Sequence, residues 1–570
     1  MYFLLLNGLT FLPFLLFFWD EASFWPVTGT ESSPAQLIYA LLAARSNPDI
    51  FRLNLELFLL AAGWLFFKPL QRKTTAHTAF LLIVLALAYN GYEGFIRSFY
   101  ALDPNFYNDF AFFRNGTSFV LDSLHMPWQV FVAGGGAAGV SLWALYKTTH
   151  ALLDPTLPGQ LSRATRRLLA GLVLGTAVQL VVVATPTWKP ETAVSSLIAK
   201  LYHNLSQSIQ AQQDNRHLQS DNLLPLYTFL NHTNLAQKPD IYFIVVESYG
   251  SVLFQRQDFN VRYQAAIKVL DERLARNGWT AVSNLSQSPT WGGGSWIAYT
   301  SALSGLRLEN HNQYQQLLNQ TQNSPLPHLF QWLHGQGYQT YRLSGMAAEI
   351  DEDEWNAYRQ FYGIDHWIRF ADVPYTGPLY GWGPALPDQY ALHYAQEEIA
   401  QADAPTAFFY ITQNSHYPWA PLPRLAPNWR TLPNAPAAPP LSGQTHAELR
   451  QHYMASILYE MQTIMAFIEQ TGDENDIFIL IGDHQPPRVA RYDDGWETPI
   501  HIIAKDAAFT AEFLQAGFVN GLNAAGAAPI HHEGLYTLLL RAMLHQYGAN
   551  GTALPPYQPN GIPWRGETGN

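Results

Sequence analysis

The hydrophobic positions divide the chain into two unlike parts. Up to about residue 186 long apolar runs dominate, and beyond that point short apolar runs alternate with amphipathic helical patterns. Roughly 20 largely apolar residues are needed for a helix to cross the hydrocarbon core of a bilayer. Five runs are candidate spans on this basis: Tyr2–Trp19, Phe51–Leu70, Ala76–Ile96, Pro127–Tyr146 and Leu168–Pro186. We therefore predict an α-helical membrane anchor of about five helices over residues 1–186.

Basic residues predict the orientation of this anchor. Lys68, Arg72 and Lys73 follow the second run, and Lys147, Arg163, Arg166 and Arg167 lie between the fourth and fifth. Cytoplasmic loops carry an excess of Lys and Arg. Both loops are therefore expected inside, which places everything after Pro186 outside the cytoplasmic membrane.

A second region, residues 187–237, is expected to connect the anchor to a soluble domain. The segment Glu191–His217 reads as an amphipathic helix that lies along the membrane or packs under the soluble domain. Apolar residues recur along it at helical spacing: Val194, Leu197, Ile198, Leu201, Leu205 and Ile209.

The third region, residues 238–570, has the pattern of an α/β domain. Buried strands are expected at Asp240–Val246, Trp279–Ser283, Tyr338–Leu343, Thr406–Thr412, Asp476–Ile481 and Thr498–Ala504. Helical patterns lie between them at Tyr263–Asn277, Asp388–Ala400 and Leu449–Gln470. Strands alternating with helices predict a mostly parallel central sheet covered by helices on both faces.

Composition narrows the functional classes. Charged residues make up only 13% of the chain, which agrees with a large membrane-embedded fraction. The net charge of −12 does not indicate the excess of basic residues that nucleic-acid binding requires. The chain has no cysteine, so disulfides, thiolate metal sites and a cysteine nucleophile are excluded.

Chemistry in such sheets lies beyond the carboxyl ends of the strands, and two strand ends carry metal-binding residue types. Glu247 follows the first strand directly, and Asp483 with His484 follows the strand Ile477–Ile481. A carboxylate at a buried strand end must be paired or bound to a cation, and Asp with His suits Zn²⁺ or Mn²⁺. The alternative for Glu247 is a helix-capping acid.

Two further segments carry candidate catalytic groups. In the glycine-rich stretch Ser288–Gly305, Thr290 and Ser295 are candidate nucleophiles, and Ser295 opens a short helix that ends at Gly305. Amides and the dipole at a helix N-terminus favour a phosphate there, although an ordinary Ser N-cap fits the same pattern. His416 follows the strand Thr406–Thr412 and is either a phosphate-binding or acid–base residue or a turn histidine.

These pieces, in this order, resemble the alkaline phosphatase superfamily, and within it the sulfatase-like membrane enzymes that include lipoteichoic acid synthases and phosphoethanolamine transferases. The resemblance implies one divalent metal ion (Mn²⁺, Zn²⁺ or Mg²⁺) held by Glu247, the Ser295 or Thr290 hydroxyl, Asp483 and His484. It also implies an alkaline-phosphatase-like fold for the third region. Much of the superfamily has its nucleophile about ten residues before a glycine, as Ser295 stands before Gly305, whereas the synthases use a Thr slightly further upstream, which matches Thr290. The helix dipole favours Ser295.

The same resemblance implies a substrate pocket. His416, in a Ser-His-x-Pro context, would bind the substrate phosphate, and Arg342, Trp355 and Trp382 would line the headgroup site. The Trp-Asn-Arg pocket sequence of the synthases appears here as Trp355, Asn356 and Ala357, and cysteines that staple many phosphoethanolamine transferases are missing. The headgroup therefore does not follow from the motifs.

The sequence thus predicts an enzyme, a phosphotransferase or hydrolase, of a bacterial cytoplasmic (inner) membrane, multi-pass, with its catalytic domain periplasmic or otherwise extracytoplasmic. It would move a phosphoglycerol or phosphoethanolamine headgroup from a membrane phospholipid to a glycan or lipid acceptor, through a covalent phospho-Ser/Thr intermediate. One alternative is an extracytoplasmic phosphodiesterase or sulfatase. Ser295 is followed by Trp-Ile-Ala, which does not match the segment that common sulfatases oxidise to formylglycine. A non-catalytic membrane scaffold is the alternative of another class.

Overall fold

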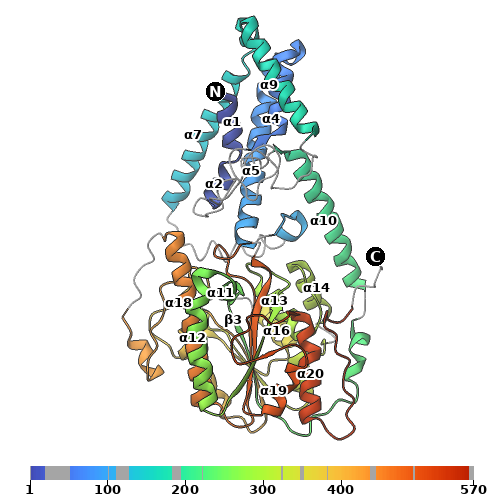
Figure 1. Ribbon diagram of the computed structural model, residues 1–570, viewed down its shortest axis with the longest axis vertical. Helices are drawn as coiled ribbons and strands as arrows, with labels where there is room; N and C mark the ends of the chain where they lie inside the picture. Colours follow the sequence, from blue (N-terminus) through green and yellow to red (C-terminus); the bar gives the residue numbers. More distant parts are fainter. Residues whose placement is uncertain are drawn as a thin grey trace. The chain divides into compact units, whose positions relative to one another are not determined.

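The computed structural model describes residues 2–18, 52–100, 102–110, 128–182, 194–220, 223–321, 325–346, 352–381, 383–436, 444–491 and 494–563. The chain falls into two compact units (Figure 1). The first comprises Met1–Ser98 and Leu102–Gln212, and the second Phe99–Ala101 and Gln213–Asn570.

The first unit is helical. Its helices are α1 (Tyr2–Thr10), α2 (Leu12–Phe18), α4 (Leu55–Phe66), α5 (Lys73–Tyr100), α7 (Trp128–Leu152), α8 (Leu157–Gln160), α9 (Arg163–Val182) and α10 (Leu197–Ser220), with a short parallel pair β1 (Leu53–Asn54) and β2 (Val194–Ser195). Each expected span coincides with a helix or helix pair. Among the described residues one helix, α5, is long and apolar enough to cross a membrane, and α4 is apolar but has only 12 residues. The multi-pass arrangement stays a prediction.

Local chemistry explains why two expected spans are shorter or interrupted. The run Tyr2–Trp19 is broken between α1 and α2, where Pro13 has no amide hydrogen to continue the first helix. Helix α4 begins only at Leu55, because the Asn54 side chain accepts a hydrogen bond from the Leu57 amide (2.9 Å).

The expected connecting helix also starts later than its apolar pattern suggests. Val194 lies in β2, and α10 begins at Leu197. The Glu56 carboxylate accepts hydrogen bonds from the Leu197 and Ile198 amides, each 3.0 Å, and so caps this helix from another segment. A cap supplied from more than a hundred residues away leaves no local signal in the sequence.

Helix α5 contains the buried carboxylate Glu93, whose charge is paired within the same unit. Lys200 Nζ lies 2.6 Å from one of its oxygens, and Arg97 Nε lies 3.2 Å from the other. A buried charge with these partners is compatible with a largely apolar helix. The polar positions in the third expected span therefore belong inside the helix and do not end it.

The second unit is built on a nine-stranded sheet. Its strands are β3 (Ile241–Val246), β4 (Thr280–Gln287), β5 (Gln339–Leu343), β6 (His366–Ile368), β7 (Thr406–Ile411), β8 (Ile477–Gly482), β9 (Glu497–Ala504), β10 (Val519–Asn520) and β11 (Ile530–His531). Their order is β10-β4-β9-β8-β3-β7-β5-β6, and β11 pairs with β4. All six expected strands are confirmed, and the short strands β6, β10 and β11 were not expected.

The sheet is mixed, so the expectation of a mostly parallel sheet holds for the block from β8 to the edge strand β6. Strands β8, β3, β7, β5 and β6 are parallel neighbours, whereas β9 runs antiparallel to both β8 and β4. Because β9 is antiparallel to both β8 and β4, strand β4 runs in the same direction as β8 and β3. The carboxyl ends of β3, β4, β5, β7 and β8 therefore lie at one edge of the sheet.

Helices cover both faces of this sheet, and β3 shows why (Figure 1). Ile241, Phe243 and Val245 point into one apolar core, and the alternate residues Tyr242, Ile244 and Val246 point into the other. Helices α12 (Gln257–Arg276), α17 (Asp388–Ile399) and α18 (His446–Thr471) supply the second core, and α13 (Ser295–Ser304), α15 (Leu329–Gly335) and α20 (His532–Tyr547) the first. A strand apolar on both faces is typical of such a layered domain.

The remaining helices are α11 (Val252–Gln255), α14 (His311–Thr321), α16 (Glu352–Tyr362), α19 (Ala507–Leu514) and the 3₁₀ segments Lys68–Leu70, Leu224–Leu230, Phe370–Asp372 and Trp429–Asn434.

Candidate active site

The register of two central strands brings the candidate metal ligands together. Val246, the last residue of β3, is directly opposite Gly482, the last residue of β8, in a parallel pair. Glu247 and Asp483 are the next residues on each strand and so emerge side by side at the carboxyl edge of the sheet. Adjacent strands lie about 4.8 Å apart, so two consecutive strand ends can share one ion.

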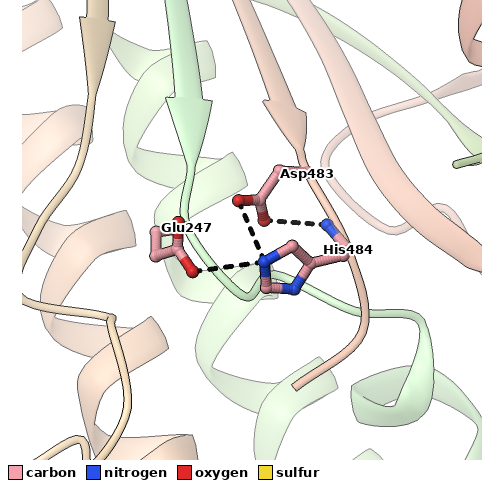
Figure 2. A group of neighbouring side chains, drawn as sticks. All are labelled: Glu247, Asp483 and His484. Carbon is pink, nitrogen blue, oxygen red and sulfur yellow. Dashed lines mark hydrogen bonds and ion pairs between the residues drawn. The ribbon is translucent and has the colours of Figure 1, made fainter. Parts of the chain in front are cut away.

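Glu247, Asp483 and His484 form a buried group that could hold a metal ion. Each offers one ligand atom, and these atoms all lie within 4.8 Å of one another. His484 Nε2 lies 3.4 Å from Glu247 Oε1 and 3.4 Å from Asp483 Oδ2. Figure 2 shows the imidazole with this nitrogen turned toward both carboxylates. Two oxygens and one nitrogen converge on one point.

Hydrogen bonds set the protonation of the histidine for metal binding. His484 Nδ1 lies 2.9 Å from the Gln485 carbonyl oxygen, which can only accept, so Nδ1 carries the hydrogen. In the neutral ring Nε2 is then left with a free lone pair. A backbone carbonyl on the second ring nitrogen is the usual way in which a metal-binding histidine is oriented.

The electrostatics of the group also fit a cation. Asp483 Oδ2 is buried and has no hydrogen-bond partner in the described structure. Burial, and then the proximity of Glu247, raise the pKa of Asp483 to about 7. Burial alone would lower the pKa of His484, but Asp483 and Glu247 raise it overall. Asp483 Oδ2 therefore accepts no hydrogen bond, although it lies beside the Glu247 carboxylate and the His484 imidazole. A divalent ion bound among these groups would satisfy it.

Ser295 is the hydroxyl that contacts this group. It is the first residue of α13, after Gly294 in a left-handed conformation (φ 75°), and α13 ends at Gly305 (φ 76°) as the sequence indicated. Ser295 Oγ donates to Glu247 Oε2 at 3.1 Å and lies 3.4 Å from His484 Nε2. The hydroxyl thus stands beside the metal-ligand candidates at the positive end of a helix.

The other nucleophile candidate lies differently. Thr290 is buried, and its hydroxyl makes no hydrogen bond to any described residue. Its amide donates to the Ser288 hydroxyl (3.2 Å), which in turn donates to the Asp483 carbonyl (2.6 Å). Thr290 therefore belongs to the loop that carries Ser295, and among the described residues its hydroxyl makes no hydrogen bond to the three candidate ligands.

His416 lies on the loop that follows β7. Its Nδ1 is 2.8 Å from the Tyr417 carbonyl oxygen, so in the neutral ring Nδ1 carries the hydrogen and Nε2 does not. Burial lowers the pKa of His416, and the charge of His484 lowers it further. The electrostatic influence of His484 and Asp483 indicates that the ring lies near the metal-ligand group. The neutral ring is favoured, with Nε2 able to accept a proton.

The loop of His416 is tied both to a buried acid and to Glu247. Asp388 accepts hydrogen bonds from the Gln413 amide (2.9 Å), the Asn414 amide (2.7 Å) and the Tyr410 hydroxyl. At the start of the same loop, Thr412 Oγ1 accepts from the Glu247 amide at 3.0 Å. One short loop therefore positions a candidate catalytic histidine and a candidate metal ligand together.

Two of the three expected pocket residues are buried in the second unit, and the third lies outside the described residues. Arg342, on β5, is 8% exposed and lies among aromatic rings. Trp355, on α16, is buried and packs edge to face against Trp367 with ring centroids 4.8 Å apart. Trp382 lies outside the described residues. None of the contacts made by Arg342 or Trp355 includes Glu247, Ser295, Asp483 or His484 within the described chain.

Residues that hydrogen-bond the candidate metal ligands, or the strand end that carries them, were not predicted from the sequence. Ser248, directly after Glu247, donates its hydroxyl to Glu247 (3.0 Å) and its amide to Asp483 (2.8 Å), at a left-handed φ of 59°. Thr498 and His532 both bond the Gly482 carbonyl, at 2.7 and 3.1 Å. Ser248 could have been found as the next polar residue after β3, whereas the other two come from distant segments with no local signal.

Comparison with known proteins agrees with the fold. Residues 239–512 match the family model "Sulfatase". No curated protein matches the sequence significantly. Among solved structures, lipooligosaccharide phosphoethanolamine transferase A (EptA) from Neisseria meningitidis is similar at 12% identity and a TM-score of 0.44, covering 95% of each chain.

Two further solved structures are similar over a smaller share of this chain. The lipoteichoic acid synthase LtaP from Listeria monocytogenes is similar at 11% identity and a TM-score of 0.37, over 62% of this chain and 81% of that one. The phosphoglycerol transferase GacH of Streptococcus pyogenes, solved with sn-glycerol-1-phosphate, is similar at 13% identity and a TM-score of 0.34, over 57% and 79%. The family match confirms the resemblance to the sulfatase-like alkaline phosphatase superfamily.

Proposed function

Because residues 239–512 form a Sulfatase-family domain, and members of this superfamily are phosphotransferases or hydrolases, we propose that this enzyme transfers a phospho-headgroup from a membrane lipid to a glycan or lipid acceptor. Ser295 is the nucleophile of the proposed reaction. The observation that carries the proposal is the position of its Oγ, 3.1 Å from Glu247 Oε2 and 3.4 Å from His484 Nε2 at the N-terminus of α13.

We assign Glu247, Asp483 and His484 as the ligands of one divalent ion, Mn²⁺, Zn²⁺ or Mg²⁺. The unpartnered Asp483 Oδ2 and the free Nε2 of His484 support this assignment. When bound, such an ion polarises a phosphoryl oxygen and lowers the pKa of a nearby hydroxyl.

In the first half of the reaction Ser295 Oγ attacks the phosphorus of the lipid phosphodiester. A Ser–O–P bond forms and the bond to the diacylglycerol oxygen breaks. Glu247 Oε2, the acceptor of the Ser295 hydrogen bond, receives the hydroxyl proton. The anionic phosphodiester favours the protonated ring of His416 in the lipid complex, and this ring donates from Nε2 to the leaving oxygen.

In the second half an acceptor hydroxyl attacks the phospho-serine. His416 Nε2, which carries no hydrogen in the neutral ring, takes the proton of that hydroxyl and is ready for the next lipid. The proton held on Glu247 returns to Ser295 Oγ as the Ser–O–P bond breaks. The amides of the first turn of α13 favour the negative charge of the phosphorylated Ser295 throughout.

The anchor fits a lipid substrate, since it confines the enzyme beside a bilayer. We propose a multi-pass protein of a bacterial cytoplasmic membrane with its catalytic domain on the extracytoplasmic side. Residues 1–186 would be the anchor, 187–237 the connection and 238–570 the catalytic domain. The basic residues after the second and between the fourth and fifth apolar runs support this orientation.

The matched pair Ser295→Ala and Thr290→Ala tests the proposal. Full-length protein in detergent is incubated with tagged phosphatidylglycerol or phosphatidylethanolamine, and tagged diacylglycerol is measured. Ser295→Ala is expected to lower turnover by at least about a thousandfold, as loss of a nucleophile typically does, and Thr290→Ala should retain activity within about tenfold. Full activity of Ser295→Ala would exclude Ser295 as the nucleophile, and full activity of both variants would exclude the covalent mechanism. Headgroup release to water in place of an acceptor would identify a hydrolase.

A further inference from the structure

Three consecutive glycines precede the proposed nucleophile, and the helix that follows explains only one of them. Gly294 has a left-handed conformation at the start of α13. The other two lie against residues that are distant in the sequence. A Cβ atom on Gly292 would stand 2.1 Å from the Phe99 carbonyl oxygen, and one on Gly293 would stand 2.8 Å from Cε1 of Tyr100. Non-bonded carbon atoms pack at about 3.5–4.0 Å, so neither position has room for a side chain.

Phe99 and Tyr100 are the last two residues of α5, and they belong to the second unit. Both are half-buried. The Phe99 ring meets the Tyr417 ring edge to face, with centroids 6.4 Å apart and an angle of 83° between the planes. On its face lies the guanidinium of Arg488, with Cζ 5.9 Å from the ring centroid. Phe99 therefore contacts three separate loops, those that follow β4, β7 and β8.

Each of these loops carries a group of the proposed reaction. The loop after β4 leads into Ser295, the loop after β7 holds His416 next to Tyr417, and the loop after β8 begins with Asp483 and His484. Loops are more mobile than the strands from which they project. Phosphoryl transfer requires the nucleophile and the proton donor to stand on opposite sides of one phosphorus atom, so the three loops must be held in register.

We propose that Phe99 and Tyr100 are positioning residues of this reaction. Tyr100 supports Gly293, two residues before Ser295, and so fixes the direction of the nucleophile. Phe99 joins the loops of Ser295, His416 and His484 through one ring and one carbonyl oxygen. The inference rests on the proposed function and adds two residues to it that make no bond to the substrate. Glycines at 292 and 293 are then required because these two residues approach so closely.

The balance between kcat and KM tests this role. Full-length Phe99→Ala and Tyr100→Ala are compared with wild type on tagged phosphatidylglycerol and phosphatidylethanolamine in mixed micelles. Each variant should lower kcat by about tenfold to a hundredfold, because a misplacement of about 1 Å can cost about a hundredfold. KM should stay within about threefold of wild type, since the loss lies in the transition state and not in lipid binding. A rise in KM with unchanged kcat would overturn the inference.

Conservative variants and a matched control separate positioning from general packing. Tyr100→Phe keeps the ring against Gly293 and should retain nearly full kcat. Phe99→Leu keeps the apolar bulk but loses the aromatic contacts to Tyr417 and Arg488, so it should still lower kcat. The control is Phe106→Ala, which removes a ring stacked on Tyr92 in the first unit, with centroids 5.6 Å apart. Its kcat should be unchanged. A loss in Phe106→Ala equal to that in Phe99→Ala would overturn the inference, as would a Tyr100→Phe variant as impaired as Tyr100→Ala.

Hydrogen exchange of the full-length protein without lipid separates this inference from the proposed function. In Phe99→Ala the amides of residues 288–295 and 412–419 should exchange at least about fivefold faster than in wild type, while those of β3 and β8 stay protected. Phe106→Ala should match wild type in these peptides. Absence of turnover on every donor would refute the proposed function, and the exchange result would still decide the role of Phe99. Unchanged exchange in both peptides, or faster exchange throughout the second unit, would refute that role.

Discussion

Asp483 carries one buried oxygen, Oδ2, that no described group bonds, and this atom is the clearest sign of a cation site at the residue scale. Its other oxygen accepts from the Ser248 and His484 amides, each at 2.8 Å, so the carboxylate is held in one orientation. Hydrogen bonds of this kind to a ligand side chain fix its position before the metal binds.

Asp483→Asn is expected to weaken metal binding by at least about tenfold, because even the loss of a residue that only hydrogen-bonds a metal ligand costs that much. Elemental analysis of the purified full-length protein, after dialysis against a chelator and reloading with Mn²⁺ or Zn²⁺, measures the metal content. Asp476→Asn is the control, since Asp476 is a buried carboxylate just before the same strand, away from the ligands. Equal metal content in wild type and Asp483→Asn would contradict the assignment.

Asp476 gives a separate prediction about pH and stability. Burial raises the pKa of Asp476 from 3.8 to about 7, and nearby acids including Asp473 and Asp240 raise it too. The folded state therefore binds the proton more tightly than the unfolded state, so stability should fall as the pH rises from about 4 to about 7. The full cost above pH 7 is at most about 4 kcal/mol.

Asp476→Asn should remove much of this pH dependence, because the amide keeps an acceptor for the Asp473 amide and carries no charge. Thermal unfolding midpoints of the full-length protein at pH 5 and pH 8 test this. The variant should gain most over wild type at pH 8. A gain that is larger at pH 5, or an equal shift at both values, would show that Asp476 is not the titrating group.

At the scale of elements, the segment Thr412–His416 carries the candidate catalytic histidine and is held in place by the buried carboxylate Asp388. Asp388 holds this loop through the amides of Gln413 and Asn414. Burial raises the pKa of Asp388, and burial together with the charge of Asp388 raises the pKa of the neighbouring buried carboxyl Glu460 strongly. Such an arrangement keeps the acceptor oxygens of Asp388 fixed beneath the loop.

Asp388→Ala is expected to lower kcat by roughly tenfold to a hundredfold, because each unsatisfied buried amide costs about 1–3 kcal/mol and the loop that carries His416 would relax. Asp506→Ala is the control. Asp506 also accepts two backbone amides, from Ala508 and Phe509, but it does so at the start of α19. It should lower the thermal midpoint with kcat nearly unchanged. Similar kcat losses in both variants would mean that Asp388 acts on general stability alone.

The long apolar strands and the polar residues at their ends could be predicted from the sequence, but strand direction and very short strands could not. The strands Ile241–Val246 and Ile477–Gly482 were predictable, because both are unbroken apolar runs, and so were Glu247, Asp483 and His484 as the polar residues that follow them. The direction of β9 was not, because Glu497–Ala504 has the same apolar pattern in either direction. Strands of two or three residues, such as β6, carry too few positions for a period to be recognised.

The environment of Arg342 was equally invisible in the sequence. The motif resemblance suggested Arg342 as a pocket residue, but the aromatic rings around it come from β6, β7, α13 and α16. Side chains from four elements meet only once the strand order is known. Conversely, the capping of α10 by Glu56 explains why an apolar pattern that starts at Val194 becomes a helix only at Leu197.

For the whole molecule, the predicted topology has a direct test, since the chain contains no cysteine and single cysteines can be introduced freely. Val261→Cys lies on α12 at a side chain that is 74% exposed. It should react with a membrane-impermeant maleimide in intact spheroplasts. Gln160→Cys, at the exposed end of α8 between the fourth and fifth expected spans, should react only after lysis. The opposite labelling pattern would invert the proposed orientation.

The central claim is that one covalent intermediate forms on Ser295. The most direct measurement is rapid acid quenching of the full-length, metal-loaded protein during turnover of a phospholipid, followed by tandem mass spectrometry of the peptide that contains Thr290 and Ser295. The account predicts a phospho-headgroup adduct on Ser295 that is lost in Ser295→Ala and retained in Thr290→Ala. An adduct on Thr290, or continued turnover with no adduct on this peptide, would contradict it.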